Sequence, residues 1–383
     1  MIPLFGIELF SFFFLKLYIL LAVGLYFGIK CSQKLSSQYS KKPHNISQKL
    51  NIQNTQEKFA LKLICFTPFV TIILSWIFIL NRFLKSHELN HNIFSALRSQ
   101  MLLDPRSLLP IYFSYINGLV FFSVMYRLLK FSENKNKITF FHLFFAVLFV
   151  LLNDLMSFGR VGMLFLIFMT AGLLYIKKIN FFKIQNLLLG AAALCLFMLP
   201  KLIRGNFQLF HENSGFSSYL TPHFNWIPPS LLDIYVYYFA PPYALSEMLK
   251  TNFFSHHTFG ARIFTPIFNA LSHVFQKIQS GQIQDPFLPT KQSFYGNIYM
   301  VIRDFYADFG IIGVFIIPFI LGFFFNFFFQ KKNIYADILK LIFFIWLFSI
   351  PIYHVFMLGS ILLCTAVAIL FYFLSQRTTL SQG

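Results

Sequence analysis

The chain has 383 residues, of which 57% are hydrophobic and only 11% are charged, whereas about a quarter of the residues in soluble globular proteins are charged. So few charged side chains cannot cover a surface that faces water. The composition therefore excludes two or three soluble domains and predicts an all-α polytopic membrane protein. The formal net charge is +18, from 31 Lys and Arg against 13 Asp and Glu. In a membrane protein such an excess reports first on topology, and we expect no nucleic-acid partner.

Apolar runs of about 20 residues, the length that crosses a bilayer, occur along most of the chain. Nine such runs predict membrane-spanning helices at residues 8–29, 60–80, 108–129, 139–156, 161–176, 186–203, 309–329, 338–353 and 355–374. The first run follows no basic region and precedes no small-residue cleavage site, so we expect it to be retained. A second short helix could fit within residues 2–30, which gives about 9–11 spans. We interpret residues 1–383 as a single integral membrane domain.

The basic residues orient these helices. Seventeen lie on alternate connections, beginning with residues 30–58, which we interpret as a cytoplasmic loop. The other side receives twelve, most of them on the connection from 201 to 303, with residues 204–297 as its large exterior loop. The inner set is fifteen Lys and two Arg, and the outer set is seven Arg and five Lys. Because a guanidinium is a planar fork that fits two phosphate oxygens, the Arg-rich outer face is the first indication of function.

The long exterior loop has apolar segments of its own. Residues 231–249 are nearly apolar and could be mistaken for a tenth span, but Asp233, the Pro241-Pro242 pair and Glu247 argue against a crossing. We expect a broken helix at the outer interface, followed by an amphipathic stretch around 261–279. Long loops of this kind are commonly functional.

Three arginine motifs lie on the outer side. Arg160 closes a Ser-Phe-Gly-Arg turn, Arg204 follows the sixth span, and Arg303 stands beside Asp304 and Asp308, which are one helical turn apart. Each arginine could instead be an interfacial anchor, and the third motif could be a collar of i,i+4 pairs and aromatic residues. Charges so close to a bilayer are costly unless they are paired or hydrated, so we favour a functional cleft.

The three arginines could surround a lipid-linked pyrophosphate. Its negative charge increases when the glycosyl bond breaks, and arginine forks would stabilise the leaving group without a metal. The reaction also needs a base for the attacking sugar hydroxyl, and the residues leave several candidates open. These candidates are Asp233, Glu247, His257, Asp304 and Asp308. Motifs for nucleotides and metals are absent, so we predict neither a metal site nor a cofactor.

Four stretches together resemble the bacterial oligosaccharide repeat-unit polymerases, the Wzy-type O-antigen and capsule polymerases. They are the turn Ser157 to Arg160, the pair Arg204-Gly205, the segment Tyr238 to Leu245 and the run from Asn297 to Gly313. The resemblance implies a multi-pass glycosyltransferase of the type-C kind in the bacterial inner membrane, with its active site facing the periplasm. Such enzymes polymerise undecaprenyl-pyrophosphate-linked repeat units into lipopolysaccharide O-antigen or capsule.

The resemblance also implies roles for residues of this chain. Arg303, Asp304 and Asp308 become the catalytic candidates. The substrate-binding candidates are Arg160, Arg204, Tyr238, Glu247, His257, Asn297, Tyr299 and Tyr306. The implied partners are a lipid-linked glycan donor and acceptor, the lipid bilayer, a chain-length regulator and a flippase.

Two alternatives stay open. An O-antigen ligase, or another lipid-linked glycosyltransferase, would use the same donor with a different acceptor. A polysaccharide flippase or transporter belongs to another class and would place ionisable groups in the middle of the membrane, between half-helices from internal repeats. The sequence has few polar residues in its apolar runs and no repeat that we detect, which favours the polymerase.

Overall fold

The computed structural model describes the chain in segments. They are residues 12–39, 59, 61–66, 69–70, 73–74, 77, 81, 112–134, 136–157, 161–178, 245, 258–274, 288–289, 295–296, 301–350 and 359–380. The helices are α1 (Phe12–Tyr39), α5 (Tyr112–Glu133), α6 (Lys137–Ser157), α7 (Val161–Ile176), α12 (Thr265–Val274), α13 (Val301–Phe329), α14 (Ile334–Ser349) and α15 (Gly359–Leu380). In these segments the only strands are β1 (Leu288–Pro289) and β2 (Tyr295–Gly296), which form an antiparallel pair. The predicted all-α class is confirmed for the described part of the chain, apart from this short pair.

Several helix bounds follow the apolar runs closely. The run at 161–176 coincides with α7, and the run at 139–156 lies inside α6. Other helices are shifted by several residues from the predicted spans. The largest departures are that α1 continues to Tyr39, into the predicted 30–58 loop, and that α13 begins at Val301 rather than at 309. Among the described helices, α13 alone is both long and apolar enough to cross a membrane by length and composition, and three apolar helices are shorter.

The chain divides into two compact units. Unit 1 comprises Met1–Lys41, Asn206–Phe327 and Trp346–Met357, and unit 2 comprises Lys42–Gly205, Phe328–Ile345 and Leu358–Gly383. Unit 1 therefore holds α1, α12, the strand pair and most of α13. Unit 2 holds α5, α6, α7, α15 and most of α14. The single membrane domain and the 30–58 and 204–297 loops stay predictions.

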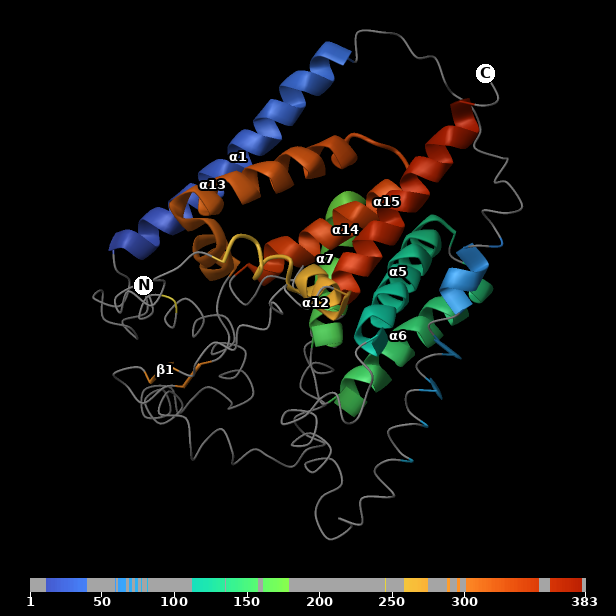
Figure 1. The fold of residues 1–383 in the computed structure, drawn as a ribbon. Helices are drawn as coiled ribbons and strands as arrows, with labels where there is room; N and C mark the ends of the chain where they lie inside the picture. The colour runs from blue at the N-terminus through green and yellow to red at the C-terminus, as the bar shows by residue number, and fades with distance from the viewer. Residues whose placement is uncertain are drawn as a thin grey trace, which may run out of the picture. The chain divides into compact units, whose positions relative to one another are not determined.

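In unit 1, α1 and α13 cross at glycines. A Cβ on Gly24 would lie 2.3 Å from the Phe315 carbonyl oxygen, and one on Gly28 would lie 2.0 Å from that of Phe319. On the facing helix, a Cβ on Gly322 would lie 2.5 Å from a backbone oxygen of α1. No larger residue fits at these positions, and the two helices run alongside each other (Figure 1). Gly24 and Gly28 have the G-x-x-x-G spacing by which membrane helices approach backbone to backbone.

Helix α13 is broken near its start. Gly310 has φ 62° and ψ −153°, a combination that is essentially restricted to glycine. The break separates a short helix, residues 301–309, from an apolar helix, residues 311–329, and α13 is visibly bent there (Figure 1). A Cβ on Gly313 would lie 2.4 Å from the Phe305 carbonyl oxygen, so the short helix folds back closely against the longer one.

In unit 2, α5 packs against α15 and α6, and α6 packs against α7. The approach of α5 to α15 is close, because a Cβ on Gly118 would lie 2.1 Å from the Ser360 carbonyl oxygen. Arg127 near the end of α5 donates to the His142 carbonyl of α6 at 3.1 Å and to Ser123 Oγ at 3.1 Å. A basic residue counted for topology thus also holds two helices together.

A second basic residue is buried at the turn between α13 and α14. Lys340 Nζ donates to Asp337 Oδ1 at 2.6 Å and to the Lys331 carbonyl oxygen at 3.0 Å. Asn333 caps α14, since its side-chain oxygen accepts from the Tyr335 backbone N–H at 2.8 Å. This turn is therefore fixed by side chains rather than left loose.

Candidate functional site

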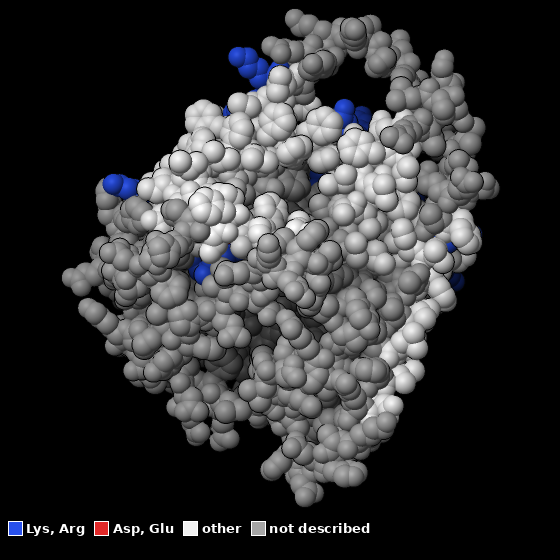
Figure 2. Space-filling view, viewed as in Figure 1, with Lys and Arg blue, Asp and Glu red and all other residues white. Residues whose placement is uncertain are grey.

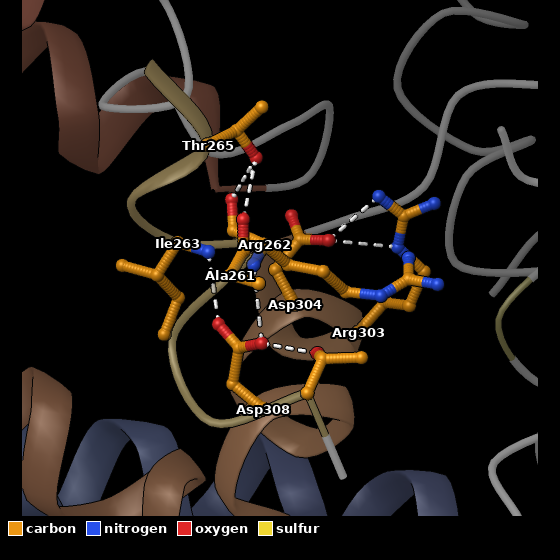
Figure 3. Close-up of polar contacts among 8 residues, drawn as sticks. Ala261, Arg262, Ile263, Thr265, Arg303, Asp304 and Asp308 are labelled. Carbon is orange, nitrogen blue, oxygen red and sulfur yellow. Dashed lines mark hydrogen bonds and ion pairs between the residues drawn. The ribbon is translucent and has the colours of Figure 1, made fainter. Parts of the chain in front are cut away.

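The site is built on the short helix of α13, in unit 1. Arg303 donates through Nε at 2.9 Å and through Nη2 at 2.6 Å to the same oxygen, Asp304 Oδ1 (Figure 3). Adjacent helical positions point in different directions, so the long arginine side chain has to bend back to reach its neighbour. Arg303 is 5% exposed and Asp304 is fully buried. Buried charges persist in proteins when they are paired in this way.

Asp308, one turn further along, is also fully buried and has a different set of contacts. Its Oδ1 accepts hydrogen bonds from the Thr258 hydroxyl and from the Arg262 backbone N–H, the latter at 3.2 Å. Its Oδ2 accepts from the Ile263 backbone N–H at 2.8 Å (Figure 3). The carboxylate therefore holds the turn that leads into α12, since both amides belong to that turn.

The same turn returns two hydrogen bonds to the short helix. The short helix ends at the break at Gly310, and carbonyls of its last turn accept these bonds. Thr258 N donates to the Ala307 carbonyl at 3.1 Å, and Phe259 N donates to the Asp308 carbonyl at 3.2 Å. We call these five hydrogen bonds between residues 258–263 and 307–308 the clasp. The clasp provides hydrogen-bond partners for backbone groups of both the short helix and the turn. Such partners matter most where water is scarce.

The local sequence explains how the turn forms. Phe259 and Gly260 both have positive φ, of 45° and 90°, so the chain reverses direction there. The Thr265 hydroxyl then donates to the carbonyls of Ala261 at 2.9 Å and Arg262 at 2.7 Å. Helix α12 begins at Thr265, with a proline next, where its missing N–H costs nothing. Of the amphipathic stretch expected at 261–279, residues 261–264 form the turn and Thr265–Val274 form a helix, while residues 275–279 lie outside the described residues.

The clasp also sets the position of a second arginine. Arg262 is 5% exposed, and its side chain extends from the turn toward Arg303 (Figure 3). Arg262, Arg303, Asp304 and Asp308 thus place two positive and two negative side chains in one buried cluster. Their formal charges balance, which is the condition under which such a cluster is stable away from water.

Several apolar side chains lie next to the residues of this cluster in the chain. Phe259 is 77% exposed and Ile312 is 67% exposed, and the rings of Phe264 and Phe309 lie 3.4 and 3.5 Å from where a Cβ on Gly260 would be. The described residues on the face in Figure 2 are mostly uncharged, with Lys and Arg only in scattered positions. Apolar side chains close in sequence to the charged cluster are therefore exposed, which suits apolar surroundings.

The structure brings together four of the predicted site residues. Arg303, Asp304, Tyr306 and Asp308 share the short helix, where Tyr306 is half-buried. The other eight lie outside the described residues: Arg160, Arg204, Asp233, Tyr238, Glu247, His257, Asn297 and Tyr299.

Sequence reasoning did not assign Thr258 or Arg262 to the site. Arg262 was counted only as an outer cation, and the available signal was a Thr-Phe-Gly turn directly before the amphipathic stretch. The contacts separate the two carboxylates that the sequence left equivalent. Three donors hold Asp308 in place, whereas Asp304 contacts the arginine fork.

Three comparisons with known proteins gave no match: none of the protein-family models, curated proteins or solved structures matches this chain. Within the described segments, no three His, Cys, Asp or Glu side chains gather in a way that could hold a metal ion. In this part of the chain, the Arg303 guanidinium lies beside the Asp304 carboxylate at the start of an apolar helix. That combination can bind an oxyanion and accept a proton.

Proposed function

We propose that the chain is a multi-pass protein of the bacterial inner membrane that polymerises undecaprenyl-pyrophosphate-linked repeat units into O-antigen or capsular polysaccharide at the periplasmic face. The first support is the large apolar area exposed on the described helices, which water would not tolerate. Side chains that are at least half exposed include Ile19, Tyr26, Phe140, Phe141, Phe144, Phe145, Ile312, Phe324, Leu370 and Phe373. Backbone contacts through Gly24, Gly28 and Gly118 add a second support, since membrane helices associate through small residues.

The break in α13 fits the thickness of a bilayer. An unbroken helix of 29 residues would be about 44 Å long, well over the roughly 30 Å of the hydrocarbon core. Residues 311–329 alone extend about 28 Å, which matches the core. The short helix with Arg303, Asp304 and Asp308 then lies at the membrane edge, where lipid headgroups and water meet.

The observation that supports the enzymatic proposal most directly is the buried Arg303–Asp304 pair at that edge. In the proposed reaction a sugar hydroxyl of the acceptor attacks the anomeric carbon of the donor glycan. The bond from that carbon to the pyrophosphate oxygen breaks, and the lipid pyrophosphate leaves with the electron pair. Asp304 accepts the proton of the attacking hydroxyl, and Arg303 stabilises the charge that develops on the leaving group.

The remaining assignments extend this proposal to other residues. Arg160 and Arg204 contribute further guanidinium groups to the donor pyrophosphate, and Tyr238, Glu247, His257, Asn297, Tyr299 and Tyr306 contact the glycan. The reaction uses no nucleotide sugar and no metal. A flippase supplies the lipid-linked units, and a chain-length regulator limits the product.

Deletion of the gene, followed by gel electrophoresis of surface polysaccharide, tests the proposal. We expect the ladder of long chains to collapse to lipid capped with a single repeat unit, and a plasmid copy to restore it. An Asp304→Asn copy should not restore the ladder, whereas a Lys332→Gln copy should, because Lys332 is exposed and distant in sequence from the site. An intact ladder in the deletion strain would refute the polymerase.

One observation favours a second candidate, a flippase for the same lipid-linked units. Transporters commonly bind substrate at broken helices, and α13 is broken at Gly310. The same gel separates the candidates. Loss of all capping, including the single repeat, identifies a flippase or an O-antigen ligase. In that case, repeat units that stay on the cytoplasmic side identify the flippase.

A further inference from the structure

We infer that Asp308 is a positioning residue, and that the turn it holds supplies Arg262 as a second guanidinium, with Arg303, for the phosphate groups of the substrate. This inference rests on the proposed function for the identity of the substrate. It departs from the sequence reading in two respects. Asp308 no longer serves as a candidate base, and Arg262 enters the site.

The Asp308 carboxylate is fully engaged in hydrogen bonds with the turn. Both of its oxygens accept hydrogen bonds from residues 258–263, and two of the three donors are backbone amides that cannot rotate away. A general base must instead direct an oxygen at the proton that it removes.

The turn held by Asp308 also positions the Arg262 side chain. The Arg262 N–H is itself one of the donors to Asp308, so the clasp fixes the backbone from which the Arg262 side chain extends. That side chain points toward Arg303 (Figure 3). Two guanidinium groups directed to one place can contact the oxygens of two phosphates, whereas one fork serves a single phosphate well.

Burial of two guanidinium groups close together has a free-energy cost. Placing a second buried cation near Arg303 is unfavourable unless negative charge is close by. Arg303 donates to Asp304, and the clasp spreads the charge of Asp308 over the donors of the turn. An anionic ligand at this place would be bound by groups already held in position, which reduces the ordering cost of binding.

Binding of inorganic pyrophosphate to the full-length protein in lipid nanodiscs, measured by isothermal titration calorimetry, tests the inference. We expect Arg262→Gln to weaken binding by about 10-fold or more, the usual effect of losing charge-assisted hydrogen bonds. The pyrophosphate affinity of Arg262→Lys should fall between those of the wild type and Arg262→Gln, because an ammonium group keeps the charge but not the planar fork. Thr258→Val should also weaken binding, although it leaves every charge in place. Lys332→Gln, which removes one exposed positive charge, is the matched control and should bind as the wild type does.

The outcomes separate this inference from the proposed function. Equal pyrophosphate affinity in the wild type, Arg262→Gln and Arg262→Lys proteins, or no binding by the wild type, would overturn the role of Arg262. Normal binding by Thr258→Val and by Asp308→Asn would overturn the positioning role of Asp308. Neither result depends on the polysaccharide ladder. Conversely, an intact ladder after gene deletion would remove the polymerase while the binding results stand.

Discussion

Replacing Gly310 with alanine tests whether α13 is broken. Gly310 has φ 62° and ψ −153°, where an L-residue with a Cβ is strained by about 1–3 kcal/mol. That strain lowers the ratio of folded to unfolded protein by about 5-fold to 150-fold. The chain could relieve it by straightening α13, but the short helix would then move away from residues 258–263. The five hydrogen bonds of the clasp would be lost, at about 1 kcal/mol each.

The measurement is unfolding of the purified protein in mixed micelles, followed by far-UV circular dichroism during titration with sodium dodecyl sulfate. Hydrogen exchange of the amides of residues 258–263 reports on the clasp in the same samples. The control is Ile311→Ala, the next residue, which is 49% exposed and has no strained backbone, so its effect should stay below about 1 kcal/mol. Wild-type unfolding together with unchanged exchange in Gly310→Ala would show that the break, and the clasp argued from it, are wrong.

Two further predictions concern packing away from the site. Gly28→Ala should destabilise the protein by about 1–3 kcal/mol in the same titration, because its Cβ would lie 2.0 Å from the Phe319 carbonyl oxygen. The exposed Phe27→Ala on the same helix serves as its control, and equal midpoints for the two variants would contradict the glycine crossing. Lys340→Met should cost about 1–3 kcal/mol, since it leaves the part-buried Asp337 carboxylate without the lysine that pairs with it. A Lys340→Met protein as stable as Lys332→Met would show that this ion pair contributes nothing.

Much of the helical layout could be predicted from the sequence, because it depends on local patterns. An apolar run fixed α7 at Val161–Ile176, and the spacing of Asp304 and Asp308 placed both on one helix. The amphipathic pattern located α12 to within a few residues. The start of α13 differs from the prediction because three charged residues among 301–308 interrupt the apolar run, although these residues are helical.

The roles of the site residues depend on contacts between distant parts of the chain. Asp308 meets Arg262 and Ile263, which precede it by 46 and 45 residues, and no local pattern indicates that pairing. The conformation of Gly310 is equally hidden, because glycine in an apolar run is compatible with a straight helix, a kink or a close crossing. The sequence therefore identified the charged residues of the short helix, but it could not show which carboxylate is the candidate base and which one holds the turn.

The glycine crossing of α1 and α13 has a consequence for how this sequence can change over time. Gly24, Gly28 and Gly322 each face a backbone oxygen within 2.5 Å of where a Cβ would be, so any other amino acid there forces the two helices to shift. The outward faces are open to exchange among large apolar residues. The chain has 56 phenylalanines, and Phe140, Phe144 and Phe373 are among those at exposed positions. Exchange of one large apolar residue for another should therefore change stability little on the outer surface, whereas a change at a crossing glycine moves the two helices apart.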